Sequence, residues 1–166
     1  MSEGGAIAAR AARRAGLAAA LLLSSIGGAA EAARPAHSYL RIDGVLGASN
    51  DPNHLGWFDV ASWTPGQPTA DGRATARITL VGAPPQDLAA AIAAHRTLHE
   101  ALLQDVRAPD GRLVRNVSFW KFVITGLAPA KTSYAVTLQA AHVVCDDYGP
   151  AADGGPCAAL KVEPHP

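Results

Sequence analysis

The sequence has few charged residues, few aromatic residues and only two cysteines. Charged residues make up 17% of the chain, and 14 Lys and Arg balance 14 Asp and Glu, so the formal net charge is zero. A neutral chain lacks the basic stripe that nucleic-acid binding requires, which argues against a nucleic-acid partner. Aromatic residues are only 5%, but the apolar fraction of 49% is that of a globular protein and excludes wholesale disorder. The length of 166 residues fits a single domain.

The short motifs of common enzymes are also missing. The chain contains no G-x-S-x-G nucleophile turn, no phosphate-binding loop and no G-x-G-x-x-G fingerprint. His95 and His99 have the spacing of two zinc ligands on a helix, but the order H-E-x-x-H is absent, which favours a solvated or capping role. His142 near Cys145 suggests a thiol nucleophile, but adjacent carboxylates would raise the thiol pKa. We therefore expect no enzyme activity and no catalytic, cofactor-binding or metal-binding residues.

Residues 1–32 have the pattern of a secretory signal peptide. A basic start precedes an apolar run at residues 15–26, and Ala30 and Ala32 then supply the A-x-A pattern of a cleavage site. The run is too short and too rich in alanine for a transmembrane anchor, which needs about 20 strongly apolar residues. Cleavage after Ala32 would leave 134 of the 166 residues. We expect secretion to the periplasm or the exterior by a Sec-type or Tat-type route, and a cytoplasmic location only if the leader is not used.

After the leader, strands and turns alternate along the chain. Residues 74–80 show the clearest pattern, with apolar side chains at every second position, as in a half-buried strand. Similar alternation or β-branched composition predicts strands over the ranges 38–43, 57–63, 117–125 and 132–144. The tryptophans fall within these strands and are expected to pack in the core or between subunits: Trp57, Trp63 and Trp120.

One helix is expected, and its end is ambiguous. Pro84 and Pro85 precede an alanine-rich stretch at residues 88–94 that has high helix propensity. Leucine and valine continue the helical spacing as far as Val106, so periodicity alone favours one long helix. The residues after the alanine-rich stretch are therefore either its continuation or a separate strand.

The first predicted strand and the loop after it comprise the run from Ser38 to Val45, Asn53-His54 in an acidic loop, and the segment that ends at Trp63. This part of the chain resembles the opening of the Hcp family, the tube proteins of the bacterial type VI secretion system, and the resemblance is most specific through Trp63. The matching positions are Tyr39, Leu40, Ile42, Asp43, Gly44, Asp59, Val60, Ser62 and Trp63. Later segments agree with the family in order and pattern, as far as about residue 149.

The resemblance implies a mainly β fold, a small antiparallel β-barrel of two sheets with one short flanking helix. In that fold the helix ends near Ala94 and residues 98–107 form a strand. The organisation that we expect is a signal peptide at residues 1–32, an Hcp-like barrel domain at 33–149 and a flexible Pro/Gly-rich tail at 150–166.

The resemblance also implies a structural, non-enzymatic function. Family members form rings, expected here to be hexamers, that stack as a secretion tube or carry effectors. The expected partners are copies of the same chain and secretion-apparatus or effector proteins, with no cofactor, no nucleic acid and no membrane once the leader is removed. A cleavable leader departs from the family, whose tube proteins leave through their own machine. The alternative is an exported monomeric barrel that binds ligands or surface proteins in the periplasm or outside the cell.

The two cysteines, Cys145 and Cys157, flank a stretch rich in Gly, Pro and Asp. In an exported chain, a pair of this kind is expected to form a disulfide. Closing the loop would stabilise the end of the last strand by about 3 kcal/mol. If the protein stays in the cytosol, two unpaired thiols are expected instead.

Overall fold

The computed structural model describes residues 37–107, 110–148 and 155–160. The chain divides into a unit of residues 1–30 and a unit of residues 31–166, and the fold described below belongs to the second. The predicted leader and its cleavage residues, Ala30 and Ala32, lie outside the described residues. None of the helices in the described ranges has the length and apolar character that a membrane span requires.

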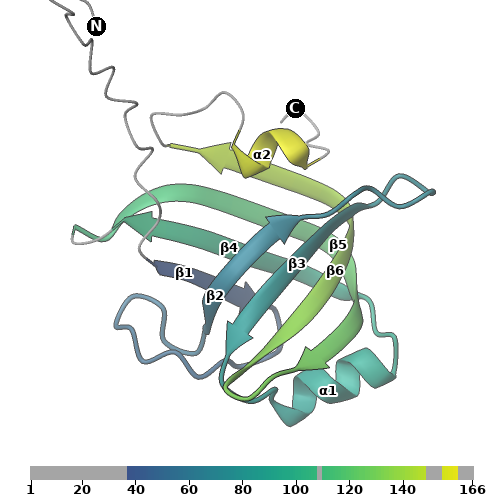
Figure 1. Ribbon diagram of the computed structural model, residues 1–166, viewed down its shortest axis with the longest axis horizontal. Helices are drawn as coiled ribbons and strands as arrows, with labels where there is room; N and C mark the ends of the chain where they lie inside the picture. Colours follow the sequence, from purple (N-terminus) through teal and green to yellow (C-terminus); the bar gives the residue numbers. More distant parts are fainter. Residues whose placement is uncertain (1–36, 108–109, 149–154, 161–166) are drawn as a thin grey trace, which may run out of the picture. The chain divides into compact units, whose positions relative to one another are not determined.

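The described residues form six strands and two short helices. In chain order they are β1 (His37–Ile42), β2 (Phe58–Pro65), β3 (Ala74–Val81), α1 (Gln86–Ala93), β4 (Leu98–Arg107), β5 (Arg112–Pro129), β6 (Ser133–Asp147) and α2 (Pro156–Ala159). The strands pair antiparallel in the order β1-β2-β3-β6-β5-β4, and β4 pairs back with β1, which closes the barrel (Figure 1). The structure thus confirms the predicted fold class, with the expected sheets joined into one closed barrel.

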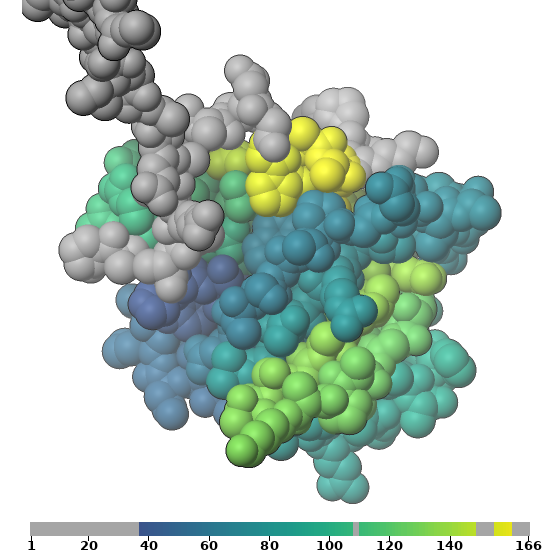
Figure 2. Space-filling view, viewed as in Figure 1, coloured from purple at the N-terminus to yellow at the C-terminus, as the bar shows by residue number. Residues whose placement is uncertain are grey.

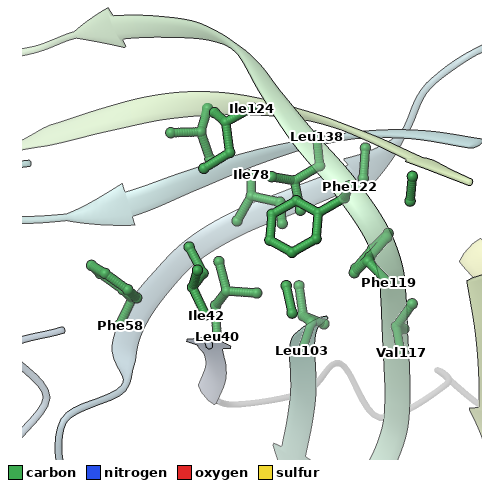
Figure 3. Close-up of a cluster of buried hydrophobic side chains, with 14 of the residues drawn as sticks. Leu40, Ile42, Phe58, Ile78, Leu103, Val117, Phe119, Phe122, Ile124 and Leu138 are labelled. Carbon is green, nitrogen blue, oxygen red and sulfur yellow. The ribbon is translucent and has the colours of Figure 1, made fainter. Parts of the chain in front are cut away.

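Alternating strand positions fill the barrel interior. In β3 the predicted apolar face points inward, and all of its side chains are buried: Ala74, Ala76, Ile78 and Leu80. β5 and β6 add larger side chains, among them Phe119, Phe122 and Leu138 (Figure 3). Full burial of one such side chain contributes about 2 kcal/mol, so this interior is the main source of stability for the barrel.

Helix α1 ends where the resemblance predicted, and the interpretation as one long helix is wrong. His95, two residues after the helix, has a φ of 46°, in the left-handed region. The N–H of His95 donates to the Ile92 carbonyl and that of Arg96 donates to the Ala91 carbonyl, both at 3.0 Å. This pair of hydrogen bonds is a Schellman motif, which satisfies the last carbonyls and turns the chain away from the helix axis. Leu98 is then buried as the first residue of β4.

Backbone contacts hold the loop between β1 and β2 close together. The N–H groups of Gly47 and Ser49 donate to the carbonyls of Gly56 and Trp57, at 2.7 and 2.8 Å. A side chain at position 47 would overlap the Trp57 carbonyl group, so this close approach requires glycine. Trp57 therefore ends the loop instead of lying in a strand as predicted, because its N–H and carbonyl are both used by loop residues.

Candidate functional site

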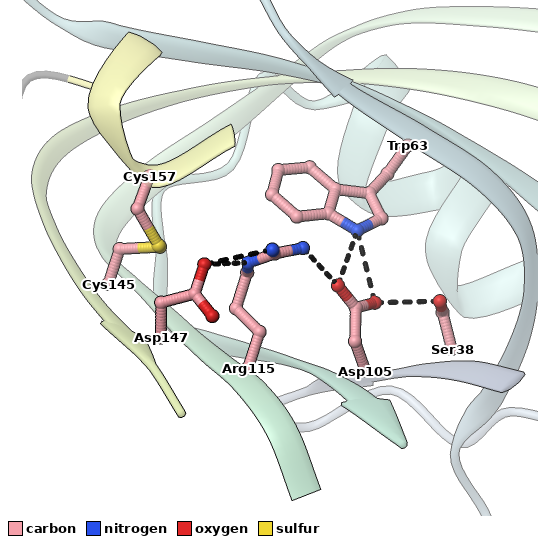
Figure 4. A network of polar contacts seen from close by, with 7 residues as sticks. All are labelled: Ser38, Trp63, Asp105, Arg115, Cys145, Asp147 and Cys157. Atoms are coloured by element: carbon pink, nitrogen blue, oxygen red, sulfur yellow. Dashed lines mark hydrogen bonds and ion pairs between the residues drawn. A yellow bond between two sulfur atoms is a disulfide. The ribbon is translucent and has the colours of Figure 1, made fainter. Parts of the chain in front are cut away.

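A buried ion pair lies at one end of the barrel (Figure 4). Asp105, near the end of β4, and Arg115, near the start of β5, are register partners on adjacent strands. Arg115 Nη1 donates a hydrogen bond to Asp105 Oδ2 at 2.8 Å, and the two residues are 0% and 9% exposed. Burial of a charge costs free energy unless partners satisfy it, so the surroundings of this pair decide its effect.

Asp105 connects four strands of the barrel. Its Oδ1 accepts a hydrogen bond from Ser38 Oγ of β1 at 2.7 Å. The indole Nε1 of Trp63, in β2, donates to both carboxylate oxygens, at 3.1 and 3.3 Å. With Arg115 on β5, these donors satisfy both oxygens of the buried carboxylate.

Arg115 carries the network on to β6. Its Nη2 and Nε donate to Asp147 Oδ2 at 2.9 and 3.3 Å. The guanidinium carbon lies 5.8 Å from the ring centroid of Trp63, within the range of a cation–π contact. Each charged or polar group in the network is paired with another side chain of the barrel. We therefore interpret the network as a structural element that stabilises the packing of the strands.

A disulfide attaches α2 to this end of the barrel. It joins Cys145 of β6 to Cys157 of α2, with Cα atoms 5.6 Å apart. Cys145 and Asp147 are two residues apart on β6 and share one side of the strand, which places the disulfide beside the network (Figure 4). Leu160, just after α2, is 5% exposed and belongs to the core cluster. Figure 2 shows α2 on the surface beside β2, so the segment predicted as a tail contains a docked helical turn.

A second polar cluster holds the β1–β2 loop against the barrel wall. The ring of His54 stacks on that of Tyr39, with centroids 3.9 Å apart, and its Nδ1 lies 2.7 Å from Asp51 Oδ1. The other ring nitrogen, Nε2, lies 3.2 Å from Oε1 of Gln104 in β4. Both ring nitrogens of His54 therefore lie within hydrogen-bond distance of a side-chain oxygen, one in the loop and one in the barrel wall.

This cluster shifts two pKa values. The hydrogen bond from His54 lowers the pKa of Asp51 from its ordinary value of 3.8. Burial raises the pKa of Tyr39 from its ordinary value of 10.0, and the negative charges of Asp51 and Asp59 raise it further. Asp51 is therefore ionised and Tyr39 neutral at pH 7, and the ionised carboxylate favours its contact with His54 in the loop.

The structure separates the other chemical candidates. His95 lies in the turn after α1 and His99 lies in β4, where its ring meets that of Trp120 edge to face, 5.4 Å between centroids. The two imidazoles therefore do not share a helical face. Cys145 is held in the disulfide, which removes its sulfur as a nucleophile beside His142.

The positions that carry the family resemblance lie in β1, in β2 and in the turn that ends β1. The buried ones lie in β1 and β2: Tyr39, Leu40, Ile42 and Val60. The exposed ones are Asp43, Gly44 and Ser62. Asp59 is half-buried, and Trp63 donates to Asp105. Gly44 has a φ of 74°, which explains why glycine suits the turn that ends β1.

Asp105 and Arg115 are not among the functional residues predicted from the sequence. The sequence pattern does contain a signal for a buried ion pair. Alternation places Asp105 on the same side of its strand as the buried Leu103, and a charged residue is rarely buried without a partner. The signal depends on the segment being a strand, which periodicity left open. The pairing partner depends on the register between β4 and β5, which was not predicted from the sequence.

No family profile and no curated protein sequence matches this chain. Among solved structures, it is similar to Hcp1 from Salmonella typhimurium, with a TM-score of 0.60 and 16% identity over 67% of this chain and 85% of that one. It is also similar to the secreted protein Hcp3 from Pseudomonas aeruginosa, with a TM-score of 0.52 and 13% identity over 68% of this chain and 97% of that one.

A third similar structure is a type VI secretion system effector from Yersinia pestis, with a TM-score of 0.51 and 12% identity over 68% of this chain and 98% of that one. At identities this low, the structural similarity shows a common fold and nothing more. The shared fold agrees with the resemblance found in the first strand and loop, and with the closed barrel and short flanking helix. The described part of this chain therefore has the fold of the Hcp proteins.

Proposed function

We propose that this protein is a structural component of type VI secretion whose copies associate into rings, which stack as a tube or carry effectors. The observation that carries the proposal is the Hcp fold, which extends over 85% of Hcp1 from Salmonella typhimurium. The proposed role needs self-association and contact with secretion-apparatus or effector proteins. It requires no catalysis, no cofactor and no nucleic acid.

The closed barrel limits how copies can meet. Each of the six strands has two neighbours within the described barrel, so no whole strand lies at a sheet edge. We therefore expect contacts between copies to use mainly loops and side-chain faces. Leu46 and Leu55 of the β1–β2 loop are 80% and 68% exposed and line one groove with Trp57. Exposed apolar groups of this kind mark interaction sites, and we assign a second copy of this chain as their partner.

We also propose that the chain is exported. The proposed organisation is a signal peptide at residues 1–32, a barrel domain at 33–149 and a tail at 150–166. The disulfide supports this proposal, because such bonds persist in oxidising compartments outside the cytosol. Intact mass of the protein recovered from the periplasm or medium tests it, with a mature chain that begins at Ala33 as the expected result and an uncleaved chain as the contrary one.

Light scattering and electron microscopy of the exported protein test ring formation. We expect a mass several times that of one chain and ring-shaped particles. Leu46→Asp should lower the mass toward that of a monomer, because it places a charge in an apolar contact. Leu46→Met is the matched control and should retain the assembly, since it keeps an apolar side chain of similar volume. A strict monomer at high protein concentration would refute the ring proposal.

A monomeric binding module is the second candidate, and a polar cleft favours it. The cleft has a volume of about 420 Å³ and is lined by His37, Tyr39, Asp51 and Arg107, among others. This mixture of aromatic and charged side chains suits a small polar ligand or a peptide. The same light-scattering experiment discriminates the two functions, because this candidate requires a monomer.

A further inference from the structure

Residues 155–160 cover one end of the barrel without taking part in its sheet. α2 contacts β2 and β6, and Leu160 enters the core cluster. The backbone hydrogen bonds of this segment run within it, from the Ala158 N–H to the Gly155 carbonyl at 3.0 Å and from the Leu160 N–H to the Cys157 carbonyl at 3.2 Å. The disulfide at Cys157 is the covalent attachment of the segment to β6.

The docked position of this segment depends on the disulfide. α2 has four residues, far fewer than a helix needs to be stable by itself in water. Among residues 155–160, only Leu160 is buried. Burial of one leucine offsets the entropy cost of ordering only about one or two residues, so it cannot by itself hold the segment in place. The tether to Cys145 lowers that entropy cost because it keeps the segment near its docking site.

We propose that residues 155–160 form a redox-controlled plug, which the disulfide holds in the barrel end and which reduction releases. The reductant is a dithiol. One of its thiolates attacks a sulfur of the disulfide and forms a mixed disulfide, and its second thiol then displaces that sulfur. Cys145 and Cys157 gain two electrons and two protons and become thiols, while the dithiol becomes a disulfide. The proposal concerns a single chain and is independent of ring assembly.

Release of the plug would change one end of the barrel and leave the rest intact. The plug contributes no strand, so the closed order of β1 to β6 does not require it. Its departure would uncover the socket of Leu160 in the core cluster and the part of β2, the strand that carries Trp63, with which α2 is in contact. The Asp105–Arg115 pair, which Trp63 contacts, would then lie nearer to solvent. An oxidising compartment would keep this end closed, and a reducing one would open it.

Hydrogen exchange of the full-length protein, with and without dithiothreitol, tests the proposal. On reduction, we expect the Ala158 and Leu160 amides to lose protection by about tenfold or more, while the β3 amides keep theirs. The double variant Cys145→Ser/Cys157→Ser should exchange at the reduced rate with or without dithiothreitol. Acrylamide quenching of Trp63 fluorescence should rise on reduction, with Trp63→Phe identifying its share of the signal.

A matched variant separates docking from tethering. Leu160→Ala keeps the disulfide but removes the buried side chain, and its Leu160-region amides should exchange faster than those of the wild type while oxidised. Unchanged protection of residues 155–160 after complete reduction, verified by thiol titration, would overturn the proposal. Equal loss of protection in β3 would also overturn it, because the disulfide would then support the whole barrel and not a local plug.

Discussion

Asp105 and Arg115 lie directly opposite each other on β4 and β5, and their side chains form an ion pair inside the barrel. Buried ion pairs often add little net stability, since desolvation offsets their attraction. Their effect on strand register is larger. A slip of β4 by one residue would turn Asp105 to the opposite face of the sheet and leave Arg115 with Asp147 alone. The pair therefore favours the observed register over its nearest alternatives.

Removal of the Asp105 charge should destabilise the barrel strongly. Asp105→Asn keeps an oxygen for Ser38 and Trp63 but removes the negative charge that faces Arg115. We expect the free energy of unfolding, measured by urea denaturation, to fall by about 3 kcal/mol.

The exposed ion pair between Arg41 and Glu100 provides the control. Its atoms are 3.0 Å apart, but the two side chains are 46% and 21% exposed. Glu100→Gln should therefore cost less than about 1 kcal/mol. Equal losses in Asp105→Asn and Glu100→Gln would contradict the importance of burial for the Asp105 pair.

Asp51 should make stability depend on pH in the acid range. Its pKa in the folded protein is lowered from 3.8, chiefly by the hydrogen bond from His54. A lowered pKa means that the ionised carboxylate stabilises the folded state above pH 3.8, and that this contribution is lost as the pH falls through the lower folded value. The melting temperature of Asp51→Asn should be below that of the wild type at pH 7, and the two should converge at the lowest pH. Asp43→Asn, which removes an exposed carboxylate from the same β1–β2 connection, is the control, and we expect its melting temperature at pH 7 to be close to that of the wild type.

The buried hydroxyl of Tyr134 should cost stability. Among the described residues, its oxygen has no hydrogen-bond partner, and burial raises the pKa of Tyr134 to about 12. Tyr134→Phe removes the unsatisfied group and keeps the ring, so we expect the free energy of unfolding to rise by about 1 kcal/mol. Tyr39→Phe is the control and should be destabilising, because the Tyr39 hydroxyl interacts with Asp51. Destabilisation by Tyr134→Phe would show that the hydroxyl is satisfied in solution.

His95→Gly should stabilise the protein by about 1 kcal/mol. His95 has a φ of 46°, which glycine adopts without the strain that a side chain introduces. Ala90→Gly, at an exposed position within α1, should have the opposite effect of similar size, because glycine disfavours a helix interior. Thermal unfolding of the two variants measures both effects. A loss of stability in His95→Gly would mean that the imidazole makes a favourable contact that outweighs the strain.

The alternation of apolar and polar residues was sufficient to predict most of the strands. β3 shows this most clearly, because each of its predicted inward side chains is buried. β5 and β6 extend beyond their predicted limits, since a long strand continues wherever a neighbour offers hydrogen bonds, even where its composition is less β-like. The end of α1 needed the family resemblance, because the residues of β4 fit both a helical and a strand period.

Local sequence pattern therefore established the strand faces, the helix start and the two cysteines that the disulfide joins, because each depends on neighbours along the chain. Closure of the barrel decided the rest. It brought Ser38, Trp63, Asp105, Arg115 and Asp147 from five strands into one network, and it created the surface on which Leu160 docks. Most of those contacts join residues 32 to 67 positions apart in sequence, and their geometry follows from strand register and barrel shape, which no local pattern encodes.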